Sequence, residues 1–115
     1  MTGYKRGDVV LAIFPNSDRQ TFKKRPVLVV QSESALTHFD QTIVAPITSH
    51  QGRVSPAMLP VNVGSPEHKS MGLLNDSVVN LETLTTLKPR EIEKKIGTCG
   101  SLLNFDPPLR VLLGL

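Results

Sequence analysis

Residues 24–30 of the chain are Lys24-Arg25-Pro26-Val27-Leu28-Val29-Val30. The last four are apolar and mostly β-branched, which indicates a buried and therefore central strand. Pro26 fixes the backbone where this strand begins, and Arg25 stands just before it. A polar and basic loop precedes the run, so we expect the Arg25 guanidinium to face solvent and to reach an anion.

Other segments carry the short apolar pattern of strands, at residues 8–14, 42–47, 58–63, 77–81 and 83–87. Pro46 within one of them favours a bulge or an edge position there. Short strands separated by Gly and Pro turns predict a mainly β fold, a small antiparallel barrel rather than βαβ units.

Helix is scarce. Residues 34–39 allow one turn, and residues 89–94 a short helix or turn. The clearest helix is at the C-terminus, where Asp106 can cap and Pro107 suits the first helical position. It is about two turns long at most, so we expect that it is stable only when packed against the barrel.

The length of 115 residues predicts a single domain over residues 1–115. No apolar run approaches the ~20 residues of a membrane span, and the N-terminus lacks the pattern of a signal peptide. Cys99 is the only cysteine, so no intrachain disulfide can form and we expect a cytoplasmic protein. The expectation for Cys99 itself is a small buried hydrophobe.

The net charge of +3 is unevenly distributed. One group of basic residues lies within the first 25 residues and a second lies between residues 88 and 95. Together they can form one field that attracts a polyanion such as nucleic acid. A plain solvated surface is the alternative.

Most familiar catalytic patterns are missing from the sequence. The three histidines, His38, His50 and His68, have no metal-ligand spacing, and we expect solvated loop residues, with no metal site and no cofactor. What remains is a set of polar residues at or near the ends of predicted strands: Arg25, Thr48, Ser49 and Glu82.

These residue types suit RNA cleavage without a metal ion. The ribose 2′-OH attacks the adjacent phosphorus, which requires a base, an acid and a group that holds the anionic phosphorane. Arg25 suits the last role, Thr48 can donate to a phosphate oxygen, and Glu82 can act as the base. Taken one at a time, each also has an ordinary explanation: a surface ion pair, a turn residue and a solvated carboxylate.

Five segments in register change this assessment. They are Arg6-Gly7-Asp8-Val9-Val10, the run at residues 24–30, Val44-Ala45-Pro46-Ile47-Thr48-Ser49, Gly72-Leu73-Leu74-Asn75-Asp76-Ser77-Val78-Val79, and Leu84-Thr85-Thr86-Leu87 followed by Ile96-Gly97-Thr98. In order and spacing the chain resembles the MazF/PemK (Kid) family of toxin endoribonucleases, from about Arg6 to Thr98.

The resemblance implies an SH3-like β-barrel of the CcdB/PemK type with a short C-terminal helix, acting as a homodimer. It implies a ribosome-independent endoribonuclease that cuts single-stranded RNA at short sequences, without metal, to leave a 2′,3′-cyclic phosphate. It also implies a cognate antitoxin whose acidic, disordered C-terminal segment neutralises the RNA groove.

The resemblance also assigns residues. Arg25, Thr48 and Glu82 take the catalytic positions. The RNA-binding positions fall on Phe22, Lys23, Lys24, Ser49, Ser77 and Asn80.

Two other hypotheses stay open. Some members carry an Arg where this chain has Asn80, and others have Gln-x-Arg where it has Thr83 and Thr85. The chain can therefore be a catalytically impaired relative that still binds RNA. It can also be a non-catalytic poison of a protein target, as the gyrase-inhibiting toxin CcdB is.

Overall fold

The structure is a computed structural model that describes residues 3–15, 18, 20–35, 40–49, 52 and 54–115. His38, His50 and the end of the turn predicted at residues 34–39 lie outside the described residues. The strands are β1 (Asp8–Pro15), β2 (Phe22–Val29), β3 (Thr42–Ser49), β4 (Met58–Val61), β5 (Ser77–Asn80), β6 (Thr85–Leu87) and β7 (Ile92–Thr98). The helices are α1 (Pro66–Met71), α2 (Asp106–Leu113) and a 3-10 turn at Pro89–Glu91.

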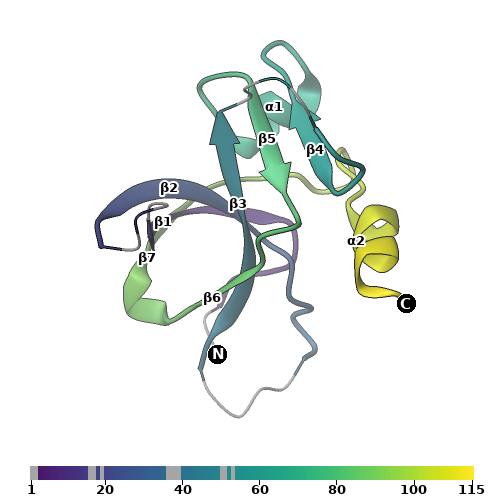
Figure 1. Cartoon of the computed structure of the whole chain (residues 1–115). Helices are drawn as coiled ribbons and strands as arrows, with labels where there is room; N and C mark the ends of the chain where they lie inside the picture. Colours follow the sequence, from purple (N-terminus) through teal and green to yellow (C-terminus); the bar gives the residue numbers. More distant parts are fainter. Residues whose placement is uncertain (1–2, 16–17, 19, 36–39, 50–51, 53) are drawn as a thin grey trace.

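All strand pairs are antiparallel, in the order β4-β5-β3-β2-β1-β7, and β6 pairs with β3 (Figure 1). This confirms the mainly β fold with a short C-terminal helix. The prediction of a barrel was wrong in one respect, because the sheet is not closed. After β4 the chain forms α1, which packs against β7, so β7 meets a helix where a closed barrel would offer it a strand.

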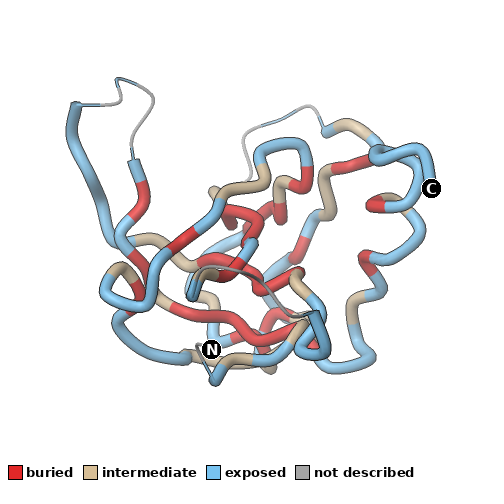
Figure 2. The backbone as a smooth tube through the Cα atoms, turned by 90° about the horizontal axis from the view of Figure 1, so that it is seen from below, coloured by how far each residue is buried: buried red, intermediate tan, exposed pale blue. Residues whose placement is uncertain are grey.

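The run that begins at Pro26 is central, as its composition predicts. β2 lies between β1 and β3, and its residues 27–29 are buried on both faces. Val9 and Leu28 belong to one core cluster, while their neighbours Val10 and Val27 belong to a second cluster on the opposite face. Buried residues accordingly gather in the middle of the molecule (Figure 2).

β3 changes partners along its length. Residues 42–44 pair with β6 and residues 47–49 pair with β5, while β2 lies on the other side. The prediction of a bulge or an edge position at Pro46 was wrong, because β3 is an interior strand and its register with β2 reaches Pro46 without a shift. Pro46 is tolerated there because it falls between the segments that pair with β6 and with β5, where no ladder bond to these strands is lost.

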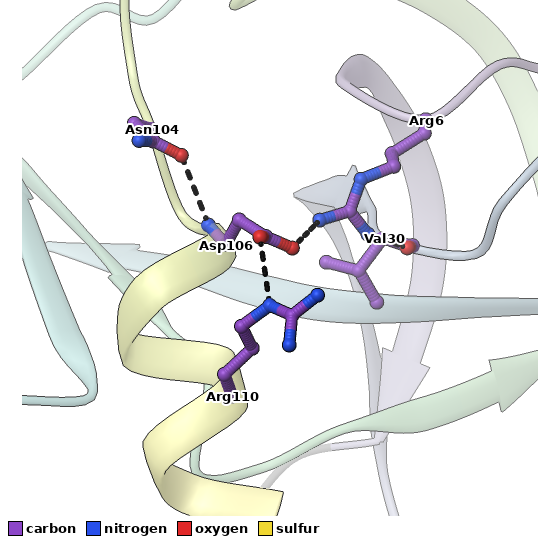
Figure 3. Close-up of polar contacts among 5 residues, drawn as sticks. All are labelled: Arg6, Val30, Asn104, Asp106 and Arg110. Atoms are coloured by element: carbon purple, nitrogen blue, oxygen red, sulfur yellow. Dashed lines mark hydrogen bonds and ion pairs between the residues drawn. The ribbon is translucent and has the colours of Figure 1, made fainter. Parts of the chain in front are cut away.

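A polar network ties α2 to the start of the chain (Figure 3). The Arg6 guanidinium donates to the Val30 carbonyl and, at 3.1 Å, to Asp106 Oδ1. It also lies 4.4 Å from the ring centroid of Phe105. Arg110 Nε donates to Asp106 Oδ2 at 3.1 Å. The predicted cap at Asp106 was wrong by one residue: Phe105 is the N-cap, and the Asp106 carboxylate binds these two arginines.

Cys99 is fully buried, as predicted, and burial raises the pKa of its thiol. No helix in the described part of the chain is long and apolar enough to cross a membrane.

Two elements were missed from the sequence, α1 and β7, and glycines explain how they fit together. A Cβ at Gly97 of β7 would lie 2.4 Å from the carbonyl carbon of Met71 and from the carbonyl oxygen of Ser70. A Cβ at Gly72, which ends α1 with φ +73°, would lie 2.3 Å from the Ile96 carbonyl oxygen. The helix therefore rests on the bare backbone of β7.

Replacing Gly97 with Ala will destabilise the fold. The added methyl meets main-chain atoms, which cannot move aside as a side-chain tip can, so we expect a loss of about 3 kcal/mol in the free energy of unfolding. Urea denaturation followed by circular dichroism measures it. Lys94→Ala, at an exposed position of the same strand, is the control. Equal stability of the two variants would contradict this packing.

Candidate anion-binding cleft

A cavity of about 260 Å³ opens where β2 and β3 separate. Val27 pairs with Pro46, and continuation of that register would place Arg25 opposite Thr48. The pairing stops instead, and β3 continues beside β5. Arg25 and Thr48 therefore stand on the two strands that border the gap, and both line the cavity.

The lining combines cationic, hydroxyl and apolar side chains. It consists of Leu11, Lys23, Lys24, Arg25, Pro26, Ile47, Thr48, Ser49, Gly72, Leu73, Leu74, Asn75, Ser77 and Ile96. Three of these are cations, and no carboxylate occurs among the described lining residues. Arg25 is half-buried, with its Nε atom shielded from solvent. Such a cleft attracts an anion with several oxygens, such as a phosphate.

Lys24 is held at the cleft by a residue from another strand. Its Nζ donates to Glu93 Oε1 of β7 at 2.8 Å, and both side chains are largely exposed. This hydrogen bond and the charge of Lys24 lower the pKa of Glu93 below its ordinary value. An ion pair so open to solvent is weak, so Lys24 remains available to a bound anion.

The segment that follows α1 forms another wall of the cleft. His68 of α1 is buried, and its Nε2 donates to the Asn75 carbonyl at 2.8 Å. The Ser77 hydroxyl donates to the same carbonyl oxygen at 2.7 Å. The prediction that His68 is a solvated loop residue was wrong. Ser65 as N-cap, Pro66 at the first position and Gly72 at the end were the missed signals of this helix.

Most of the residues chosen from the sequence come together. Arg25, Thr48, Lys23, Lys24, Ser49 and Ser77 all line the cleft. Phe22 lies next to it at the start of β2 and is 63% exposed. Leu73, Leu74 and Asn75 also line the cleft, although the sequence analysis gave them no role. These three residues carry no charge, so only the structure places them at the site.

Asn80 and Glu82 are not brought to the cleft. The Asn80 amide donates to Thr83 Oγ1 at 3.2 Å, and its Oδ1 accepts from the Glu82 amide at 2.9 Å. Glu82 Oε2 accepts from the Ser55 hydroxyl at 2.7 Å. These bonds build the turn after β5, which places the carboxylate away from Arg25 and Thr48. Among the described residues, no three His, Cys, Asp or Glu side chains cluster as metal ligands would.

The profile of the PemK-like, MazF-like toxins of type II toxin–antitoxin systems matches residues 5–103. The chain belongs to this family. A Mycobacterium tuberculosis toxin, MazF-mt6, is 26% identical, with a TM-score of 0.66 over 93% of this chain and 92% of that one.

Two more distant structures share the fold. One is an endoribonuclease in complex with its cognate antitoxin from a mycobacterial species, at 19% identity and a TM-score of 0.71 over 98% and 97% of the two chains. The other is a MazE–MazF complex from Deinococcus radiodurans, at 20% identity and a TM-score of 0.67 over 97% of each chain.

Removing Lys24 will raise the pKa of Glu93. Lys24 stabilises the carboxylate form, so the ion pair is complete above the ordinary pKa of Glu93 and is lost as the pH falls through the lowered value. In Lys24→Ala we expect the titration midpoint to move up toward that of a free glutamate. NMR of the Glu93 carboxyl carbon measures it, and Lys23→Ala should leave it unchanged. The same midpoint in Lys24→Ala and wild type would contradict the contact.

Proposed function

We propose that this toxin is a sequence-specific, ribosome-independent endoribonuclease that cleaves single-stranded RNA without a metal ion. The observation that carries the proposal is the cationic cleft in which Arg25 and Thr48 border one gap between separated strands. Family membership adds the toxin role.

The chemistry follows from the groups in the cleft. The ribose 2′-OH loses its proton to water as its oxygen attacks phosphorus. The bond to the 5′-oxygen breaks and that oxygen takes a proton from water, so the products are a 2′,3′-cyclic phosphate and a 5′-hydroxyl. Arg25 offers a planar donor to the phosphorane, whose negative charge exceeds that of the ground state. The Thr48 hydroxyl positions a phosphate oxygen. We assign the rate enhancement to these two residues and give Glu82 no part, because it lies outside the cleft.

The surrounding residues bind the rest of the strand. Lys23 and Lys24 contact neighbouring phosphates, Ser49 donates to one of them, and exposed Phe22 stacks on a base. The Ser77 hydroxyl already donates to the Asn75 carbonyl, so we propose that Ser77 maintains the shape of the cleft and does not bind RNA directly. Asn80 supports the turn beside it.

The partners follow from charge and exposed apolar surface. A cognate antitoxin with an acidic, disordered C-terminal segment would lie across the cleft and neutralise its cations, and proteins of the same fold occur in antitoxin complexes. We also propose a cytoplasmic homodimer. Val111 and Leu115, at the end of the chain, are 79% and 80% exposed and offer apolar surface to a second copy.

Cleavage of long single-stranded RNA in EDTA tests the activity. The wild type should cut at short sequences and leave cyclic phosphate ends. Arg25→Ala and Thr48→Val should each lower the rate by about 100-fold or more, because each removes a donor to the developing charge. Arg90→Ala removes an exposed arginine elsewhere and serves as the control. Glu82→Gln should keep the activity.

Three results would decide against this assignment. Intact RNA at high protein concentration would contradict the proposed endoribonuclease activity. If the protein then still bound RNA with a steep salt dependence, the chain would be an RNA-binding relative. If RNA stayed intact in cells while plasmid supercoiling changed, a protein-target poison would be the better description.

A further inference from the structure

One apolar side chain stands at the lip of this polar cleft. Leu74 lines the cavity and is 90% exposed, more than any other large apolar side chain in the described part of the chain. Single exposed leucines are common on protein surfaces. Leu74 differs from them because it borders a cationic cavity and its backbone is held in place.

Contacts on both sides of Leu74 hold that backbone. The Asn75 carbonyl accepts from buried His68 and from Ser77, at 2.8 and 2.7 Å. The side chain of the next residue, Asp76, accepts from the Val63 amide at 2.7 Å. Toward the N-terminus, Gly72 rests on the β7 backbone. A buried histidine and a tightly packed helix end therefore fix a short loop that exposes a leucine to solvent.

The cleft has two chemically different parts. Lys23, Lys24 and Arg25 supply positive charge on β2. Leu73 and Leu74, with Ile96 of β7, supply an apolar surface. A phosphate alone would need only the first part. A nucleotide of single-stranded RNA has both an anionic phosphate and a flat, apolar base face, and it matches both parts.

The volume supports a single base. About 260 Å³ lies below the ~300 Å³ at which pockets for drug-sized molecules begin. A cavity of this size has room for one unstacked base. Sequence-specific RNA recognition uses such splayed bases in single strands.

We infer that Leu74 contacts the face of one unstacked nucleobase, and that residues 72–75 thereby help to determine which RNA sequence the protein selects. This inference rests on the proposed function and adds a specificity-determining residue to it. His68 is its positioning residue, because it holds the loop and does not line the cavity.

The test measures binding, so that it does not depend on cleavage. Fluorescence anisotropy compares two short oligonucleotides with 2′-O-methyl riboses, which cannot be cut. One has mixed bases and the other is abasic with the same phosphate charge. Leu74→Ala should weaken binding of the first by about five- to tenfold and leave the second unchanged. Leu74→Met should restore binding, since it keeps the apolar contact.

Leu102→Ala is the control, because Leu102 is 50% exposed and lies outside the cleft. Equal weakening of both oligonucleotides, or of neither, would overturn the inference and leave the proposed function standing. If Leu74→Ala changed only the oligomeric state, the lip would be an interface between copies. If the wild type bound neither oligonucleotide, the proposed function would fail, and the inference with it.

Discussion

The separation of β2 from β3 after the pair of Val27 and Pro46 is the constraint on which the site depends. Paired strands lie too close for a ligand to enter between them. Pro26 stands at the point where the pairing stops, and it cannot donate the next hydrogen bond of the ladder to β3. On its other edge β3 pairs with β5 over residues 47–49, which holds this end of β3 in the sheet while the gap beside β2 stays open.

An open gap needs another wall, and the glycines supply it. Gly97 and Gly72 let α1 come to rest on the backbone of β7, which brings the following loop beside the end of β3. His68 and Ser77 then fix that loop through one carbonyl oxygen. The stability of the α1–β7 contact and the shape of the cleft are therefore linked. A methyl group at Gly97 acts on both.

The local pattern predicts the strands well and the assembly less well. Val27 and its neighbours are apolar on both faces, and such a strand must be central wherever it lies. α1 was missed because it has only six residues and its caps were not recognised. β4 and β7 are the two ends of the strand order, and the barrel closes only if they pair with each other. The residues of β4 do not show whether they do. Residues on β2 and β3 were found because charge and hydroxyl groups stand out at strand ends. The uncharged residues 73–75 carry no such signal. Glu82 carries one, but its carboxylate binds Ser55 outside the cleft.

The cations of the cleft differ in how firmly the protein holds them. Arg25 is half-buried, so its position is largely set by the fold, and a cation positioned in this way suits an anionic ligand. Lys24 is exposed and rests on Glu93, which holds the ammonium at the cleft until a stronger anion arrives. Exchange of one exposed partner for another involves little change in solvation, so another anion can readily replace Glu93. Glu93 therefore lies beside the cleft, on β7, and pairs with a lysine without occupying the cavity.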